Sequence, residues 1–182
     1  MAWTVPMTAV AGSVWTAAQY NTFVRDNLNE LCPAKAQTPG GYFVTSATNQ
    51  IVERTILQDA RNSPSDTTSS TSYGDLDASA GPQVTGTTGS MALIVVGGRI
   101  GPNSLAAGSV KMSWEISGAS SVSASDNWAA GVVGVGSTGV GYTSRAYLQT
   151  GLTPGVNIFT AKYAVSSGTG SFLYRSILVM PF

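Results

Sequence analysis

Four aspartates are the residues of this 182-residue chain that come nearest to a catalytic or metal-binding set. Asp75 and Asp77 lie two apart in the stretch YGDLDAS, whereas Asp66 and Asp126 stand alone. Paired carboxylates can hold calcium or hydrolyse a glycosidic bond, but this stretch lacks the dense oxygen ligands and the distal Glu of a calcium loop. Asp is also a common turn residue. We therefore predict that these aspartates occupy turns and form no catalytic pair.

The chain has no histidine and a single cysteine, Cys32. These counts exclude Ser-His-Asp and Cys-His catalysis, histidine metal ligands and an internal disulfide. Cys32 follows a predicted helix, where the helix dipole disfavours a thiolate, so we expect it to be a small apolar end-cap. We predict no enzymatic activity, no cofactor and no metal. A polysaccharide hydrolase using Asp75 or Asp126 is the alternative that turnover would reveal.

Two further stretches have a structural interpretation. GVVGVGSTGVG, residues 131–141, has the glycines of a phosphate-binding loop, but no Lys-Ser or Lys-Thr pair ends it and no helix follows. We predict a β connection there. Along a predicted strand, Val110, Met112, Trp114 and Ile116 are expected to point one way, and Lys111, Ser113 and Glu115 the other. The Glu115 side chain should therefore face solvent or a partner.

Composition narrows the classes of partner. Charged residues make up 10% of the chain, hydrophobic residues 43%, and the net charge is zero. Without a basic stripe we predict no nucleic-acid binding, and weak self-repulsion favours assembly with other copies. The N-terminal sequence lacks the pattern of a signal peptide, and no apolar run is long enough to span a bilayer. We expect a protein made in the cytoplasm that does not enter a membrane.

SVWTAAQYNTFVRDNLNEL is the one clear helical pattern. Thr16 and Gln19 fit a capping box, and Trp15 and Tyr20 have the spacing of a hydrophobic staple. Because Pro33 disfavours helical geometry at the residue before it, we predict a helix from about Ala17 to Leu31. Its apolar stripe, which either packs on the chain's own sandwich or contacts other subunits, consists of Tyr20, Phe23, Val24, Leu28 and Leu31.

The remainder reads as β structure. Nine strand-like segments with turn residues between them and no intervening helices predict an antiparallel β-sandwich, with a jelly roll as the expected wiring. The segments are TSYGDL, QVTG, MALIVVGGRI, GSVKMSWEIS, SVSAS, WAAGVVGV, YTSRAYLQT, NIFTAKYAV and FLYRSILVM. The apolar ending SILVMPF is expected to pair within a sheet. We divide the chain into an attachment segment and helix, 1–33, a linker with short strands, 34–66, and a β-sandwich domain, 67–182.

Aromatic residues of the predicted sandwich have two interpretations. They could fill the core or a subunit interface, as aromatic residues commonly do, or they could form a platform for carbohydrate. The residues are Trp114, Trp128, Tyr142, Tyr147, Phe159, Tyr163, Phe172 and Tyr174.

Both ends of the chain resemble structural proteins of tailed bacteriophages that infect actinobacteria. The N-terminal run resembles the pattern W…P…V.G…TA…NTHVRDNL of these proteins, with Phe23 where the pattern often has His. The matching residues are Trp3, Pro6, Val10, Gly12, Thr16, Ala17, Asn21, Thr22, Val24, Arg25, Asp26, Asn27 and Leu28. The C-terminal stretch from GLTPG to the end is similar to the ending of the same group's β-sandwich domains.

The resemblance implies a virion protein with an N-terminal attachment segment and a compact trimeric jelly-roll head. We therefore predict a capsid-decorating or surface-spike protein on the virion surface, a homotrimer whose partners are the major capsid protein or tail proteins. The alternative is a minor tail or tail-tip protein that recognises a host surface glycan. The residues expected at the oligomer or virion interface are Trp3, Trp15, Tyr20, Phe23, Val24, Leu28 and Leu31.

Overall fold

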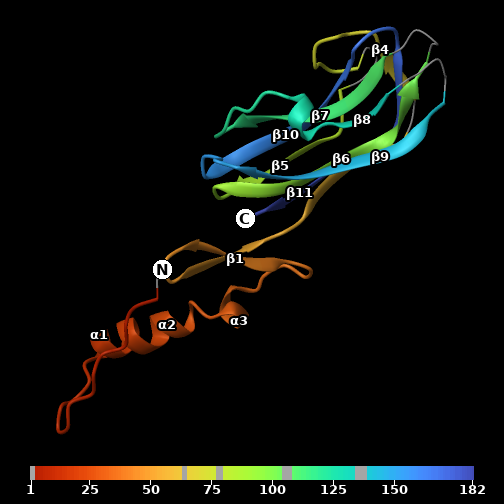
Figure 1. Cartoon of the computed structure of the whole chain (residues 1–182). Coiled ribbons are helices and arrows are strands. Elements are labelled where there is room, and N and C mark those ends of the chain that lie inside the picture. The colour runs from red at the N-terminus through yellow and green to blue at the C-terminus, as the bar shows by residue number, and fades with distance from the viewer. Residues whose placement is uncertain (1–2, 63–64, 77–79, 104–107, 134–138) are drawn as a thin grey trace. The chain divides into compact units, whose positions relative to one another are not determined.

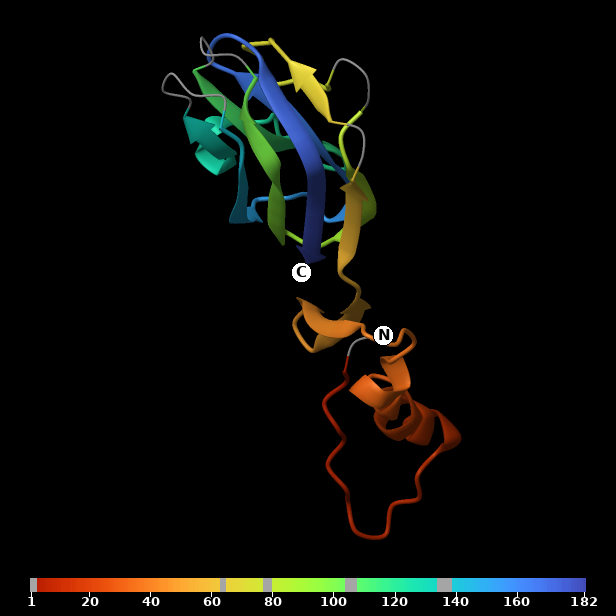
Figure 2. The same ribbon diagram turned by 90° about the vertical axis from the view of Figure 1, so that its right-hand side faces the viewer.

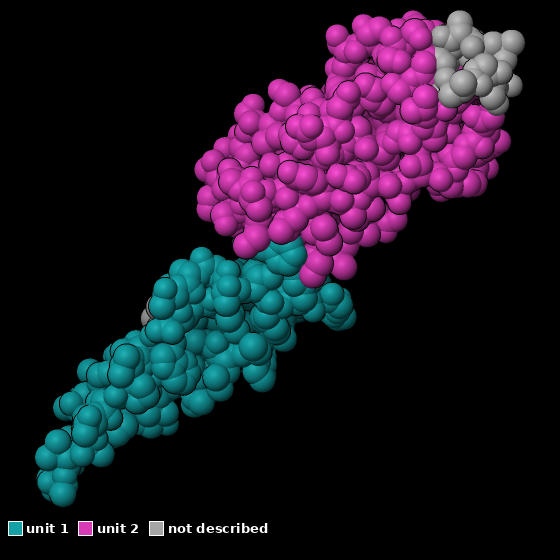
Figure 3. All heavy atoms as spheres, in the orientation of Figure 1, with its two compact units in different colours: residues 1–55, 182 teal, residues 56–181 magenta. Residues whose placement is uncertain are grey.

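A computed structural model of the protein describes residues 3–62, 65–76, 80–103, 108–133 and 139–182. The chain forms two compact units, residues 1–55 with Phe182 and residues 56–181, which Figure 3 shows in separate colours. The boundary falls inside the segment 34–66, which we predicted to be a linker with short strands. That segment is therefore divided between the units and contributes strands to both.

The larger unit contains two antiparallel sheets that face each other (Figure 1). All strand pairs in both sheets are antiparallel, as predicted. The first sheet has the order β5 (Gln83–Thr88), β10 (Gly155–Val165), β7 (Ser109–Gly118) and β8 (Ala130–Val133). The second has the order β3 (Leu57–Arg61), β11 (Gly170–Pro181), β6 (Met91–Pro102) and β9 (Gly141–Thr150), and β4 (Asp66–Thr68) also pairs with β11.

Seven of the nine predicted strand segments correspond to strands β5 to β11. The other two predictions were wrong: TSYGDL and SVSAS make only the isolated bridges Gly74–Tyr163 and Ile116–Val122. The short strand β4 lies in a polar stretch outside all nine predicted segments. The apolar ending pairs as predicted, because β11 lies between β6 on one side and β3 and β4 on the other. The jelly-roll wiring stays a prediction.

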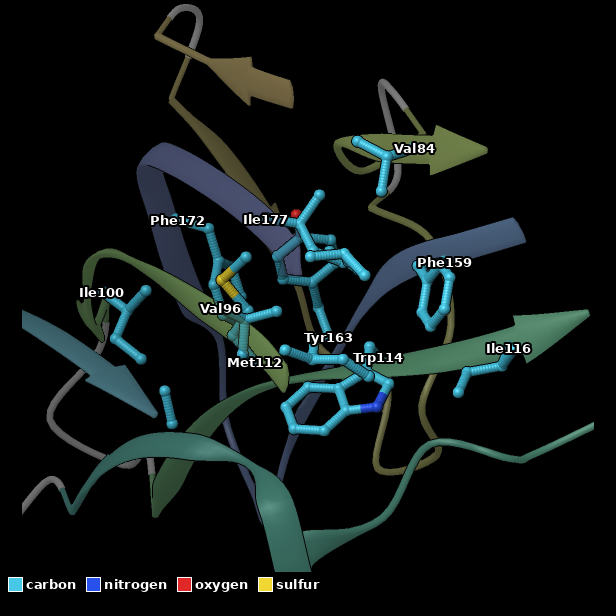
Figure 4. Packing of buried hydrophobic residues seen from close by; sticks show 14 of the residues in the cluster. Val84, Val96, Ile100, Met112, Trp114, Ile116, Phe159, Tyr163, Phe172 and Ile177 are labelled. Carbon is cyan, nitrogen blue, oxygen red and sulfur yellow. The ribbon is translucent and has the colours of Figure 1, made fainter. Parts of the chain in front are cut away.

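The core lies between the two sheets. Strand β7 alternates as predicted at its apolar positions, since Val110, Met112, Trp114 and Ile116 are all buried. Phe159, Tyr163 and Phe172 join them from β10 and β11 (Figure 4). One expectation differs: Ser113, predicted to face outward with Lys111 and Glu115, is buried because its hydroxyl group exchanges hydrogen bonds with the backbone of Ser125.

The smaller unit begins with an extended segment that turns at Gly12 and leads into a helix (Figure 2). The helix runs through α1 (Ala17–Tyr20), the π-helical turn η1 (Asn21–Arg25) and α2 (Asp26–Leu28). The capping box between Thr16 and Gln19 is present as predicted. Among the described residues, no helix is long and apolar enough to cross a bilayer.

The end of the helix differs from our prediction. It stops at Leu28, and Pro33 lies in the first turn of a new short helix, α3 (Cys32–Lys35). Proline is tolerated in a first turn because its missing N–H would have no partner within the helix there. Cys32 therefore begins a helix and is exposed, so its predicted role as an apolar end-cap was wrong. The unit ends with the hairpin of β1 (Tyr42–Ala47) and β2 (Gln50–Arg54).

Candidate functional site

Asn27 is the only residue among residues 3–55, the described part of the smaller unit, that is buried as a whole, although the Glu30 side chain is also only 7% exposed. Its side-chain Oδ1 accepts a hydrogen bond of 2.8 Å from the backbone N–H of Thr4. Its Nδ2 donates to the carbonyl oxygens of Thr4, at 2.8 Å, and Phe23, at 3.0 Å. An asparagine amide can pair with a peptide group in this two-way manner. Asn27 therefore fixes the N-terminal segment against the helix.

Other polar contacts join the helices to the hairpin. The Lys35 ammonium group lies 2.8 Å from the Glu30 carboxylate and donates a hydrogen bond to the carbonyl oxygen of Ile51. This ammonium group holds the pKa of the Glu30 carboxyl below its ordinary value. The Glu53 carboxylate accepts hydrogen bonds from the backbone N–H groups of Gln37 and Thr38. Hydrogen bonds and ion pairs thus connect the parts of this unit.

Large apolar side chains of the same unit are exposed. Five of the seven residues predicted at an interface belong to this set: Trp3, Trp15, Tyr20, Leu28 and Leu31. The other two, Phe23 and Val24, are half-buried. Valine side chains of the N-terminal segment, which our reasoning missed, are also exposed: Val5, Val10 and Val14. The sequence did offer a signal for their exposure, because these apolar residues precede the helix and belong to no predicted strand.

The π-helical turn changes the expected stripe. A π turn contains one residue more than a turn of regular α-helix. The residues after it are therefore rotated by about 100° around the helix axis from the positions they would have in an uninterrupted α-helix. Tyr20 precedes the turn and Leu28 follows it. The two side chains are therefore not aligned by a single 3.6-residue period, although both are exposed.

The sandwich has a second apolar surface, on the outer face of the sheet that contains β11, β6 and β9. Residues that alternate with the core positions of these strands face outward. By register, Leu93 pairs with Leu148 and Met180, and Val95 pairs with Leu178. Leu148 is exposed and the other four are half-buried. Sequence reasoning missed this face, because continuous apolar runs do not show which side of a strand is covered.

A shallow groove of about 320 Å³ lies further along this sheet, at its Gly97–Gly98 segment. Two tyrosines line it, Tyr142 of β9 and Tyr174 of β11, with ring centroids 6.3 Å apart and planes at 14°. They are 75% and 47% exposed, whereas the other aromatic residues predicted in the sandwich are buried or packed against the core. The structure thus divides those eight residues between core and surface.

Among the described residues, the aspartates considered for catalysis have different partners. Asp75 and Glu115 both contact the Lys162 ammonium group, at 3.0 and 3.1 Å. Asp66 lies in strand β4, so its predicted place in a turn was wrong. It is buried and accepts a hydrogen bond from the backbone N–H of Thr67, and Asp77 lies outside the described residues. No group of three metal-ligating side chains occurs in the part of the chain that the structure describes.

Asp126 has two polar partners on the sandwich. Its carboxylate lies 2.7 Å from the Lys111 ammonium group and accepts a hydrogen bond of 2.7 Å from the Tyr73 hydroxyl. Lys111, and then Tyr73, hold the pKa of Asp126 below its ordinary value. A general acid of a glycosidase needs a raised pKa, so this environment favours a stabilising ion pair instead.

No protein-family model matches the sequence, and no curated protein is significantly similar to it.

Proposed function

We propose that the chain is a non-enzymatic structural protein of a bacteriophage virion, attached through its N-terminal unit. The observation that carries this proposal is that the unit buries polar side chains and exposes apolar ones, the reverse of an ordinary hydrophobic core. Its described residues bury the polar side chains of Asn27 and Glu30 and no apolar residue, while eight large apolar side chains are exposed. An exposed apolar set of this size marks a surface that another molecule covers.

The energetics favour an obligate contact. A unit of about 55 residues is marginally stable even with a core, and an isolated hairpin is not stable in water. Each hydrogen bond of the polar framework contributes only about 0.5–1.5 kcal/mol. Covering one large apolar side chain contributes about 1.5–3 kcal/mol. Contacts with a partner would therefore supply more stabilisation than the unit's own framework.

The resemblance of both chain ends to tailed-phage structural proteins supports a place on the virion surface. The partner of the N-terminal unit would be the major capsid protein or a tail protein. The protein would decorate the capsid or form a surface spike. In this proposal Trp3, Trp15, Tyr20, Leu28 and Leu31 are covered on attachment or on contact between copies.

We infer further that the sandwich is a jelly roll and that three copies associate. Between β4 and β11, every connection passes to the other sheet except the one from β7 to β8. That alternation is what two Greek keys require. The outward residues Leu93, Val95, Leu148, Leu178 and Met180 supply an apolar face on which copies can pack.

The oligomeric state of the full chain tests this proposal. Size-exclusion chromatography with light scattering should give three times the 18.7 kDa of one chain. Leu28→Lys, which places a cation at a helix C-terminus and so preserves the helix, should weaken the trimer or its attachment to the particle. Val156→Lys is the matched control, because Leu28 and Val156 are both 55% exposed and Val156 belongs to the sandwich.

A stable monomer whose helix amides are protected from hydrogen exchange would contradict the assembly. Cryo-electron microscopy of the intact particle would show whether the protein lies on the head or the tail.

The second candidate function is that of a minor tail or tail-tip protein that recognises a host surface glycan. The exposed tyrosine pair, Tyr142 and Tyr174, favours it. Adsorption of the phage to host cells, blocked by the free protein, would distinguish receptor recognition from decoration.

A further inference from the structure

The tyrosine groove is an assembled feature of three neighbouring strands. Tyr142 comes from β9 and Tyr174 from β11, and the strand between them, β6, contributes Gly97 and Gly98. The two rings are nearly parallel and solvent-exposed. Parallel aromatic faces that remain open to solvent can stack a flat apolar surface of a ligand.

A backbone irregularity positions one of the rings. Tyr174 has φ +50°, in the left-handed region that a bulky residue rarely adopts. It lies where the register between β11 and β6 shifts, between Leu173 and Ser176. Gly98 makes this bulge possible, because a Cβ there would lie 3.1 Å from the carbonyl oxygen of Leu173. Such strained residues gather at functional sites, so the bulge points to a use for the exposed ring.

The remaining groups of the groove are neutral and polar. Ser144 and Ser176 line it on either side of Gly97, and their hydroxyl groups make no side-chain hydrogen bond to any residue that the structure describes. Thr143 also lines the groove, but it follows Tyr142 directly in β9, so its side chain faces the other side of the sheet. None of the described residues that line the groove carries a charged side chain. Tyrosine, serine and glycine are also the residues that binding surfaces use for rigid contact area and adaptable hydrogen bonds.

These properties select one chemical class of ligand. A pyranose has an apolar C–H face that can lie on a ring and hydroxyl groups around its edge that can bond to serine and threonine. Single-stranded nucleic acid also stacks on aromatic residues, but it needs a positively charged groove. Proline-rich peptides also bind in aromatic grooves, but their binding depends less on free hydroxyl groups of the protein around the aromatic residues.

We infer that this groove is a saccharide-binding site, with one pyranose unit stacked on Tyr142 and Tyr174 and bonded to the hydroxyl groups of Ser144 and Ser176. The inference stands apart from the assembly proposal, since a protein that fails to form trimers can still bind sugar through this groove.

Nuclear magnetic resonance of the full chain tests the site. The probes are the methyl glycosides of β-D-glucopyranose, β-D-galactopyranose and α-D-mannopyranose, each at about 50 mM, a concentration that nearly saturates a site with a Kd on the order of 1 mM. At least one glycoside should shift the amide signals of Gly97, Gly98 and Tyr142. A proline-rich decapeptide serves as the competing class of ligand.

Variants locate the binding. Tyr142→Ala and Tyr174→Gly should each weaken binding about tenfold, and glycine at 174 also removes the backbone strain. Tyr142→Phe keeps the stacking face and should retain affinity within about twofold. Val156→Ala, an exposed apolar residue of the other sheet, should leave affinity unchanged. Absence of shifts with all three glycosides, unchanged affinity in Tyr142→Ala, or shifts with the peptide alone would overturn the inference.

Discussion

The two units of the chain use apolar and polar side chains in opposite ways. The sandwich buries Trp114, Tyr163, Phe159 and Phe172 between its sheets and leaves ion pairs such as Lys111–Asp126 on its surface. The N-terminal unit buries the amide of Asn27 and exposes tryptophan, leucine and valine side chains. The sandwich therefore holds its own core, whereas the N-terminal unit leaves eight large apolar side chains exposed among its described residues.

The same substitution in each unit should show this difference most strongly. Trp114→Ala should lower the free energy of unfolding by about 3–5 kcal/mol, because it removes a fully buried indole. Trp15→Ala, at a 42% exposed indole, should change it by less than about 1 kcal/mol in the isolated chain. Urea denaturation followed by circular dichroism measures both.

In the assembled state, the effect of Trp15→Ala on assembly should exceed that of Trp114→Ala. On the particle, or in the trimer, Trp15→Ala should reduce occupancy or raise the dissociation constant, and Trp114→Ala should act mainly through folding. Equal losses of unfolding free energy for the two variants in the isolated chain would show that the N-terminal unit has a core of its own.

Removal of the buried amide should loosen the N-terminal unit and leave the sandwich intact. Asn27→Ala breaks three hydrogen bonds to the backbone of Thr4 and Phe23. The loss should destabilise the attachment of the N-terminal segment by about 1–3 kcal/mol. Hydrogen exchange at the Thr4 amide should become faster, with the melting temperature of the sandwich unchanged. Asn29→Ala, at an exposed position of the same helix end, is the control. Unchanged exchange at Thr4 would contradict this role.

A smaller effect concerns the surface charges of the sandwich. The pKa of Asp126 lies below its ordinary value when the protein is folded, first because of Lys111 and then because of Tyr73. The resulting stabilisation is present above the unfolded-state pKa and is lost as the pH falls through the folded-state pKa. Asp126→Asn should therefore flatten the acid limb of stability against pH. The carboxylate is mostly exposed, so the effect should stay below about 1 kcal/mol.

Denaturation at a series of pH values between neutral and strongly acidic conditions checks this effect. Lys111→Met should flatten the same limb, because it removes the first cause of the shift. If either variant lost stability with falling pH as the wild type does, other carboxyl groups would be the cause of that pH dependence.

Local patterns predicted much of the fold. The capping box depends on residues three apart, and the alternation of Val110, Met112, Trp114 and Ile116 depends on the pleat of one strand, so both could be read from neighbouring residues. The segments TSYGDL and SVSAS misled us because a short alternating run gives no information about how many residues pair. The strand β4 was missed because a central partner, β11, supplies the pairing that its own polar sequence does not indicate.

The sequence by itself determined seven strands of the sandwich, the start of the helix, the absence of histidine chemistry, and five of the exposed residues expected at an interface. Those properties depend on composition or on contacts between near neighbours. Only the tertiary structure decided that Asn27 would be buried against Thr4, that the helix would contain a π turn, and that Tyr142 would lie beside Tyr174 over two glycines. The Asn27 and tyrosine contacts join residues far apart in the chain, and strand order and packing set such contacts.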